Sequence, residues 1–273
     1  MQSIVTTLYH RPYVAAFLVA FLVIGILNRG VTRTLLLLVI GYTVAFLSEF
    51  CSIRWGFPYG MYHYIYENMP GELMLGGVPV WDSLSYVFMA YASWEMAHLG
   101  PHPQPLIRPL YPSGTSPPTS GGVPRRRVRA ALLMMLLDIV TDPLAVRGDR
   151  WFLGKIFYYP HGGFYFGVPL SNFAGWFLVG LVIFSIYSIL EKKFCPLPSA
   201  GEGGPAQRGR VRALGPLFYL SIMLFNLAIT FWIGEWKLGI TSTAVLCVLL
   251  RQSSKVWGSL RRASRCGPGV STG

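Results

Sequence analysis

Residues 168–190 have the sequence VPLSNFAGWFLVGLVIFSIYSIL, an apolar run without a charged side chain. Backbone N–H and C=O groups inside a bilayer must bond to one another, so a run of about 20 apolar residues predicts a membrane-spanning helix. Six further runs follow the same pattern, at residues 13–27, 35–49, 80–98, 128–143, 214–233 and 238–250. The sequence therefore predicts an all-α protein, a polytopic transmembrane helical bundle of about seven spans.

The composition of the 273-residue chain agrees with this fold class. Hydrophobic residues make up 53% of the chain and charged residues only 12%, about half the share usual in soluble proteins. These values exclude a disordered chain, a soluble enzyme of ordinary composition and a disulfide-stapled secreted domain. The net charge of +12 does not indicate a nucleic-acid partner, because Lys and Arg lie in short runs between apolar stretches. We expect a single transmembrane domain over residues 1–273, with the lipid bilayer as its surroundings.

The distribution of basic residues predicts the orientation of the chain. Cytoplasmic loops of membrane proteins are enriched in Lys and Arg. With seven spans, six of the 23 basic residues fall on the side of the N-terminus and 17 on the opposite side. The sequence therefore predicts a multi-pass protein of the cell membrane, with an outside N-terminus and a cytoplasmic C-terminus. The first span is expected to be an uncleaved anchor, since no small-residue cleavage site follows it.

Three segments are predicted to lie outside the packed bundle on the cytoplasmic side. Residues 101–124 are rich in Pro and Ser, and residues 196–210 have a similar composition. Neither segment carries enough apolar surface to build a core, so both are expected to be flexible inner loops. Residues 251–273 form a basic cytoplasmic tail.

The cysteines and histidines do not form a recognisable metal or redox motif. Cys51, Cys195, Cys247 and Cys266 are single and widely spaced, so no disulfide is predicted. The five histidines are too scattered for the His boxes of a membrane di-iron enzyme. A helical face shared by Glu95, His98 and His102 is interrupted by Pro101. We expect no metal and no cofactor.

Polar side chains gather at the predicted outer ends of five helices. They are Glu49, Asp82, Asp138, Asp142, Asn172 and Glu235. Helix ends are generally polar, but Asp138 lies one turn deeper in its apolar run. An acid buried in a membrane is costly and is a functional candidate by default.

Asp138 and Asp142 are four residues apart and share one face of a helix. Apolar surroundings favour a neutral carboxyl, and two close carboxyls do not ionise together. Such a pair can supply a neutral acid and an anionic base for general acid–base chemistry. The alternative is structural, with Asp138 hydrogen-bonded to another helix and Asp142 capping the helix beside Pro143.

Two outer loops are unusually rich in aromatic, Gly and Pro residues. Residues 56–64 have the sequence GFPYGMYHY, and residues 158–169 have the sequence YYPHGGFYFGVP. An aromatic belt at the membrane interface would account for the aromatics. It would not require so many turn residues, so we expect the loops to cover a cavity for a flat apolar ligand.

Four motifs stand out in the middle of the chain. They are Gly56-x-Pro58-Tyr59-Gly60-x-Tyr62-x-Tyr64, Gly77-Val78-Pro79, Asp138-x-x-x-Asp142-Pro143 followed by Trp151, and Tyr165-x-Gly167-Val168-Pro169-x-x-Asn172-Phe173-x-Gly175-Trp176. Together they resemble a known family, the carotenoid-biosynthesis membrane proteins, which include carotenoid 1,2-hydratases of the CruF type. The resemblance covers roughly residues 49–176, and Ser52 stands where we expect Gly.

The resemblance implies cofactor-independent addition of water to the terminal double bond of an acyclic carotenoid, giving a tertiary alcohol. This chemistry needs a neutral acid, a pocket that stabilises a tertiary carbocation, and an oriented water. Asp138 is the expected acid, and Asp142 or Glu49 the expected base. The expected substrate-binding residues are Tyr59, Tyr62, Tyr64, Asp82, Tyr165, Asn172 and Trp176.

Two other functions remain open at the level of the sequence. A non-catalytic membrane protein that binds a carotenoid or another isoprenoid would use the aromatics, while its acids only pack. A proton-coupled carrier would use the acids as a relay, but should show inverted repeats, which the sequence lacks.

Overall fold

The computed structural model describes residues 2–98, 122–194 and 205–265. The loops predicted at 101–124 and 196–210 and the tail predicted at 251–273 lie wholly or partly outside these residues. The described residues form eight α-helices and two small antiparallel strand pairs. The helices are α1 (Gln2–His10), α2 (Pro12–Arg29), α3 (Val31–Trp55), α4 (Val80–Ala97), α5 (Gly122–Ala145), α6 (Leu170–Phe194), α7 (Pro205–Trp232) and α8 (Trp236–Arg265).

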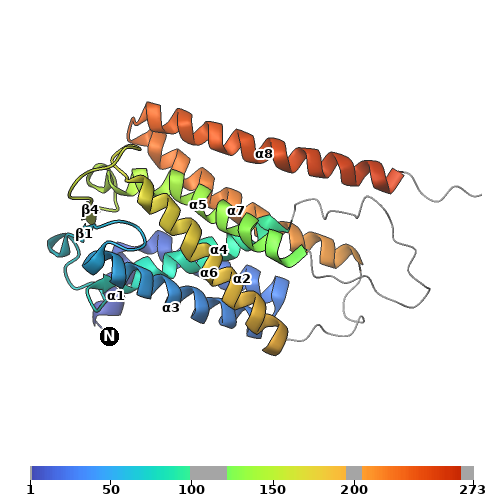
Figure 1. The fold of residues 1–273 in the computed structure, drawn as a ribbon, viewed down its shortest axis with the longest axis horizontal. Coiled ribbons are helices and arrows are strands. Elements are labelled where there is room, and N and C mark those ends of the chain that lie inside the picture. The colour runs from blue at the N-terminus through green and yellow to red at the C-terminus, as the bar shows by residue number, and fades with distance from the viewer. Residues whose placement is uncertain (1, 99–121, 195–204, 266–273) are drawn as a thin grey trace, which may run out of the picture.

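Helices α2 to α8 run back and forth along the long axis of the molecule (Figure 1). Each of them overlaps one of the seven apolar segments predicted from the sequence, and α1 is an additional short helix. The turn between α7 and α8 is tight, with Gly234 at a φ of +76°. The all-α prediction is therefore confirmed.

Four of the described helices are long and apolar enough to cross a membrane. They are α2, α3, α6 and the Ala213–Trp232 part of α7. Many of their large apolar side chains face outward; Val39 is 63% exposed and Leu27 64%. So large an apolar surface requires a hydrocarbon neighbour. The chain is a helical membrane protein, and the seven-span count stays a prediction.

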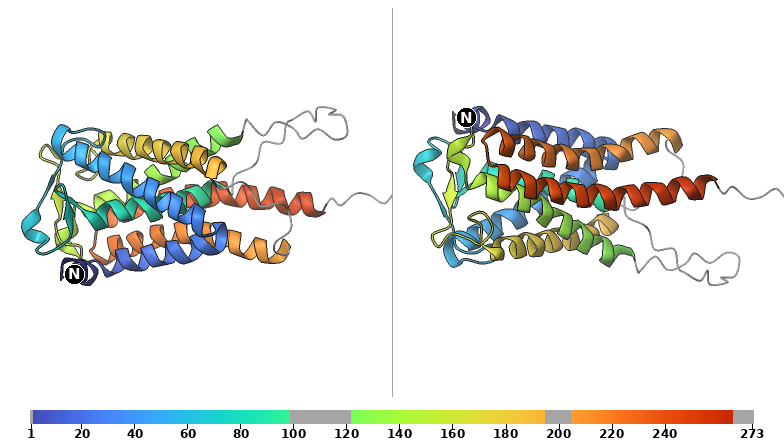
Figure 2. Two further views of the ribbon diagram at one scale, coloured as in Figure 1. Left: turned by 90° about the horizontal axis from the view of Figure 1, so that it is seen from below. Right: turned by 90° about the horizontal axis from the view of Figure 1, so that it is seen from above.

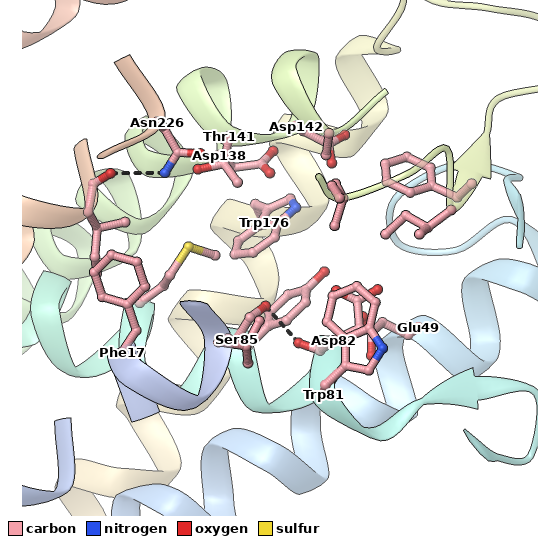
Figure 3. Close-up of a pocket in the computed structure, with 18 of the residues that line it drawn as sticks. Phe17, Glu49, Trp81, Asp82, Ser85, Asp138, Thr141, Asp142, Trp176 and Asn226 are labelled. Carbon is pink, nitrogen blue, oxygen red and sulfur yellow. Dashed lines mark hydrogen bonds between the residues drawn. The ribbon is translucent and has the colours of Figure 1, made fainter. Parts of the chain in front are cut away.

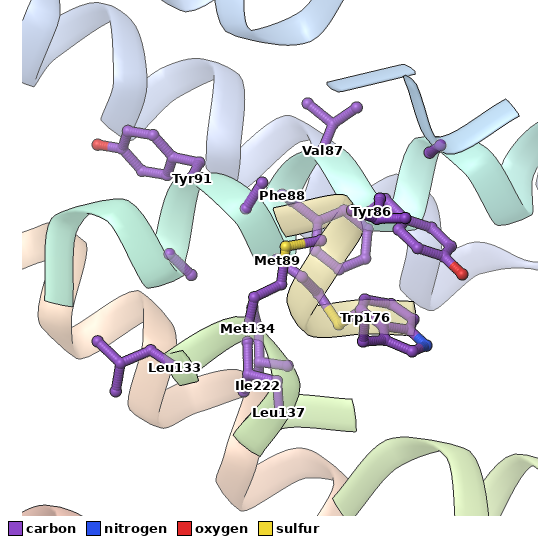
Figure 4. Close-up of a cluster of buried hydrophobic side chains, with 14 of the residues drawn as sticks. Tyr86, Val87, Phe88, Met89, Tyr91, Leu133, Met134, Leu137, Trp176 and Ile222 are labelled. Carbon is purple, nitrogen blue, oxygen red and sulfur yellow. The ribbon is translucent and has the colours of Figure 1, made fainter. Parts of the chain in front are cut away.

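Helix α4 lies at the centre of the bundle. Most of its side chains are buried, including Trp94, Tyr91 and Val87. Figure 4 shows α4 residues packed against α5, α6 and α7 around Met89, Met134 and Ile222. Because α4 contacts helices rather than lipid, it accommodates polar and aromatic residues, and it is not among the four apolar spans.

The segments that follow α3 and α5, residues 56–79 and 146–169, form one layer at the end of the bundle near the N-terminus (Figure 1). We call this layer the roof. Its strand β1 (His63–Tyr64) pairs with β4 (Phe157–Tyr158), and β2 (Met74–Leu75) pairs with β3 (Val78–Pro79). The first pairing joins the two aromatic loops that the sequence placed on one side of the membrane.

The roof is attached to the bundle by a close approach to α6. A Cβ atom on Gly175 would lie 2.6 Å from Cδ1 of Tyr59 and 2.8 Å from the carbonyl oxygen of Pro58. Ser171 donates a hydrogen bond of 3.1 Å to the carbonyl of Tyr59, and the Tyr59 N–H donates to Ser52 Oγ at 3.1 Å. Only glycine at position 175 leaves room for this contact.

Ion pairs that are buried or partly buried lie at both ends of the bundle. At the roof, Arg11 pairs with Glu72 at 2.9 Å, and both side chains are almost fully buried. At the opposite end, Arg29 pairs with Glu95 and Glu191. A buried charge left without its partner is strongly destabilising, so these pairs tie the segments that carry them into one arrangement.

Candidate functional site

A cavity of about 120 Å³ lies beneath the roof, and helices α2 to α7 all contribute residues to its lining. Eight of the ten residues predicted for the site line it (Figure 3). These eight residues are Glu49, Tyr59, Tyr62, Asp82, Asp138, Asp142, Asn172 and Trp176. These eight residues come from α3, α4, α5, α6 and the first part of the roof, residues 56–79, so segments distant in the sequence meet at one site.

The first carboxyl pair is Asp138 and Asp142 on α5. Asn172, at the start of α6, donates from Nδ2 to Asp138 Oδ2 at 2.7 Å and to Asp142 Oδ2 at 3.0 Å. Tyr159 of the roof donates to the same Asp142 oxygen at 2.8 Å. One amide thus fixes both carboxyls, and the two hydrogens of its NH2 group satisfy both contacts.

The two oxygens of Asp138 have different surroundings. The side chain is fully buried, with 0% exposure. Oδ2 accepts the Asn172 hydrogen bond, whereas Oδ1 has no hydrogen-bond partner among the described residues. A buried ionised oxygen without a donor is very costly, so Oδ1 is the atom on which a proton is best accommodated.

The second carboxyl pair is Glu49 on α3 and Asp82 at the start of α4. The two carboxyls are close enough to influence each other's ionisation, so they do not readily ionise together. Ser83 donates to Glu49 Oε2, and Tyr64 donates to Asp82 Oδ2 at 2.7 Å. Figure 3 shows this pair on the wall of the cavity opposite Asp138 and Asp142.

Aromatic side chains line the cavity between the two carboxyl pairs. Trp176 of α6 stacks on Tyr86 of α4, with ring centroids 4.0 Å apart and planes 7° from parallel. In the roof, Tyr62 contacts Tyr159 edge to face at 6.0 Å. Burial raises the pKa of Tyr62 and Tyr159 well above that of an ordinary phenol, so both remain neutral.

Three predicted polar or aromatic residues lie apart from the cavity. Tyr64 does not line the cavity but donates a hydrogen bond to Asp82, which does. Tyr165 does not line it and packs against Phe166 and Phe173. Glu235, which the sequence grouped with the other acids, instead forms ion pairs with Arg147 and Arg150.

The structure adds lining residues that the sequence argument did not nominate. Among them are Trp81, Tyr86, Thr141, Tyr159 and Asn226. Tyr159 belongs to a predicted aromatic loop, and Asn226 is a polar residue inside an apolar run, so both could have been identified as candidates from the sequence. Trp81, Tyr86 and Thr141 carried none, because only helix packing shows which face is turned to the cavity.

The acids of the cavity do not form a metal centre by the usual criterion. Within residues 2–98, 122–194 and 205–265, no three His, Cys, Asp or Glu side chains converge as a ligand set. Each carboxyl already has a hydrogen-bond partner from a neighbouring segment. The arrangement suits proton transfer between buried acids and an apolar ligand.

The fold and the cavity together define a helical membrane protein with a buried acidic site. The sequence model of the carotenoid biosynthesis protein family matches residues 10–250. The match includes every residue of the cavity and all of the described spans, so this chain belongs to the carotenoid biosynthesis protein family. No curated protein and no solved structure matches the chain significantly.

Proposed function

We propose that this protein hydrates the terminal double bond of an acyclic carotenoid end group, without a cofactor, and releases a tertiary alcohol. The observation that carries the proposal is Asp138, a fully buried residue of the cavity lining whose Oδ1 has no hydrogen-bond partner among the described residues. Family membership supports carotenoid chemistry. The activity would make the protein a hydro-lyase.

The size of the cavity suits the end of a carotenoid rather than its whole length. The volume is about 120 Å³, whereas an apolar cavity of about 150 Å³ holds one benzene molecule. A five-carbon isoprenoid terminus is of this size. The remainder of the polyene would lie outside the cavity.

The first step is a proton transfer from Asp138 Oδ1 to the less substituted carbon of the terminal double bond. The π electrons form the new C–H bond, and the positive charge falls on the tertiary carbon. Asn172 holds Oδ2, so it directs the protonated oxygen away from itself. General acid catalysis of this kind is worth about 10²–10⁴-fold in rate.

The resulting cation would be stabilised by aromatic faces and by a nearby negative charge. The stacked Trp176 and Tyr86 present extended π surfaces to the cavity. Cation–π contacts contribute about 0.5–2 kcal/mol each. Trp176 lies between the two carboxyl pairs (Figure 3), next to the space where the charge would form.

Water then adds to the cation and loses a proton to the ionised Asp142. Tyr159 and Asn172 donate to Asp142 Oδ2, which keeps this carboxylate oriented. Proton exchange between Asp142 and Asp138, one helical turn apart, restores the starting state. Glu49 and Asp82, which also line the cavity, are the second candidate pair for acid and base.

We further propose that the protein crosses the cell membrane seven times, with its N-terminus and roof outside and its C-terminus in the cytoplasm. The alternation of α2 to α8 (Figure 1) and the basic residues gathered away from the roof support this arrangement.

Pigment analysis of lycopene-producing cells, with and without this chain, tests the activity. We expect a new, more polar carotenoid whose hydroxyl oxygen comes from heavy-oxygen water. Label from molecular oxygen would indicate an oxygenase and would contradict the proposal. Unchanged lycopene that copurifies with the protein would indicate a non-catalytic binding protein.

A further inference from the structure

We propose that the seam between α2 and α7 is a lateral entrance, closed by Phe17 and Phe225, through which a linear isoprenoid chain reaches the cavity from the hydrocarbon layer. The identity of the chain as an acyclic carotenoid rests on the proposed function. The path itself rests on the shape and lining of the cavity.

The cavity has an acidic end and an aromatic end. The four carboxyls belong to α3, α4 and α5, whereas α2 and α7 contribute Phe17 and Phe225 to the lining. Figure 3 shows Phe17 at the end of the cavity opposite Glu49. A hydrocarbon chain whose terminus reaches the acids would therefore lie along Phe17 and Phe225.

At the aromatic end, the wall of the bundle is a single layer of side chains. Phe17 and Phe225 line the cavity and are themselves partly exposed. Their near neighbours Val19 and Leu224 point outward, with 58% and 53% exposure. Figure 2 shows α2 and α7 side by side along one edge of the bundle, so this seam faces the lipid.

The seam is closed at this point by ring contacts. Phe17 meets Phe225 edge to face, with centroids 5.4 Å apart, and stacks on Phe88 at 5.5 Å. A phenylalanine ring can change rotamer without breaking a hydrogen bond. The two rings can therefore turn aside when contacts with the entering chain replace the ring contacts that are lost.

The roof is a much poorer route for a hydrocarbon. It is joined by strand pairing and by the buried Arg11–Glu72 ion pair, which would have to break. A chain entering there would also pass through water, where its apolar surface is unfavourable. Since the cavity holds only a chain end, the rest of the polyene would pass between α2 and α7 into the bilayer.

Enlarging the closing rings tests the entrance by kinetics. We expect Phe17→Trp and Phe225→Trp to lower kcat/KM for lycopene in phosphatidylcholine–phosphatidylglycerol vesicles by tenfold or more, with a smaller fall in kcat. Leu224→Trp adds the same side chain to the outward face of α7 and should leave both values within twofold. Equal effects at positions 224 and 225 would contradict the proposal.

A reversible cross-link tests the same path without relying on turnover. Phe17→Cys and Phe225→Cys are combined in a chain whose four native cysteines are replaced by Ser, and joined by a short bis-methanethiosulfonate. Transfer of lycopene from loaded vesicles to the protein should slow at least tenfold and recover after reduction. A control link between Phe231→Cys and Trp236→Cys, whose parent rings are 5.5 Å apart at the α7–α8 turn, should leave transfer unchanged.

The two assays separate the entrance from the activity. If the cross-link blocks lycopene uptake but the unmodified protein never forms an alcohol, the entrance holds and the hydratase proposal fails. If the cross-linked protein takes up and hydrates lycopene at the normal rate, the entrance is wrong and the activity stands.

Discussion

Asp138 combines two conditions that together favour a neutral carboxyl. It is fully buried, and one of its oxygens has a donor while the other has none among the described residues. Burial without full hydrogen bonding is unfavourable for an anion and tolerable for a neutral acid. Asp142 differs because it is only partly buried and its Oδ2 accepts two hydrogen bonds, from Tyr159 and Asn172.

The first prediction concerns the proton donor. Asp138→Asn keeps the shape of the side chain but removes the acidic proton, so turnover of lycopene should fall by about 10²–10⁴-fold. Protein yield and lycopene binding should be retained. Asp142→Asn is expected to lower turnover less than Asp138→Asn, because it removes the base but not the acid. Full turnover in Asp138→Asn would assign the acid to the Glu49–Asp82 pair.

The second prediction concerns the donor that the roof supplies to Asp142. Tyr159→Phe removes a hydrogen bond of 2.8 Å to Oδ2. A hydrogen bond to a charged group contributes about 1.5–3 kcal/mol, so kcat should fall by about tenfold or more. Tyr158→Phe is the matched control, because Tyr158 is 41% exposed and does not line the cavity. If both variants keep full turnover, the Tyr159 hydroxyl does not orient the base.

At the scale of elements, the start of α6 positions both the chemistry and the roof. It carries Asn172 and Trp176, which line the cavity, and Gly175, against which Tyr59 and Pro58 pack. The spacing in the sequence places these three residues within about one helical turn, so one helix end serves the site and its cover.

The third prediction uses that close approach. Gly175→Ala would place a methyl group 2.6 Å from the Tyr59 ring, so the roof must shift. Overpacking of this kind costs about 1–3 kcal/mol, and we expect a lower unfolding temperature in detergent together with reduced turnover. Ala174→Ser, at an exposed neighbouring position, should change neither. An unchanged unfolding temperature in Gly175→Ala would mean that the roof is not held against α6.

At the scale of the whole molecule, a cluster of basic residues lies at the end opposite the roof. Arg29, Arg33 and Arg126 lie at the end away from the roof, around Glu95, Glu191 and His98. This polarity is the structural counterpart of the charge asymmetry along the chain.

The fourth prediction tests the orientation in the membrane. In a chain without its native cysteines, His161→Cys in the roof should react with a membrane-impermeant maleimide in intact cells. Arg125→Cys, exposed at the other end of the bundle, should react only after permeabilisation, because we place it in the cytoplasm. The reverse pattern of labelling would invert the topology.

The sequence by itself predicted the helices, the pairing of Asp138 with Asp142, and the family. Membrane helices are held by local hydrogen bonds, and long apolar runs in the sequence predict them. Two residues four apart in a helix share a face in any fold. The alternation of helices also brought the two aromatic loops to one end, where β1 and β4 join them.

Tertiary structure alone decided which other side chains meet this pair. It set the Glu49–Asp82 pair against Asp138, brought in Tyr86 and Phe225, and left Tyr165 and Glu235 outside the cavity. The reason is that a helix turns about 100° per residue, so its lining face depends on how it is rotated against neighbours distant in sequence. Helix packing fixes that rotation through contacts that an apolar run does not encode.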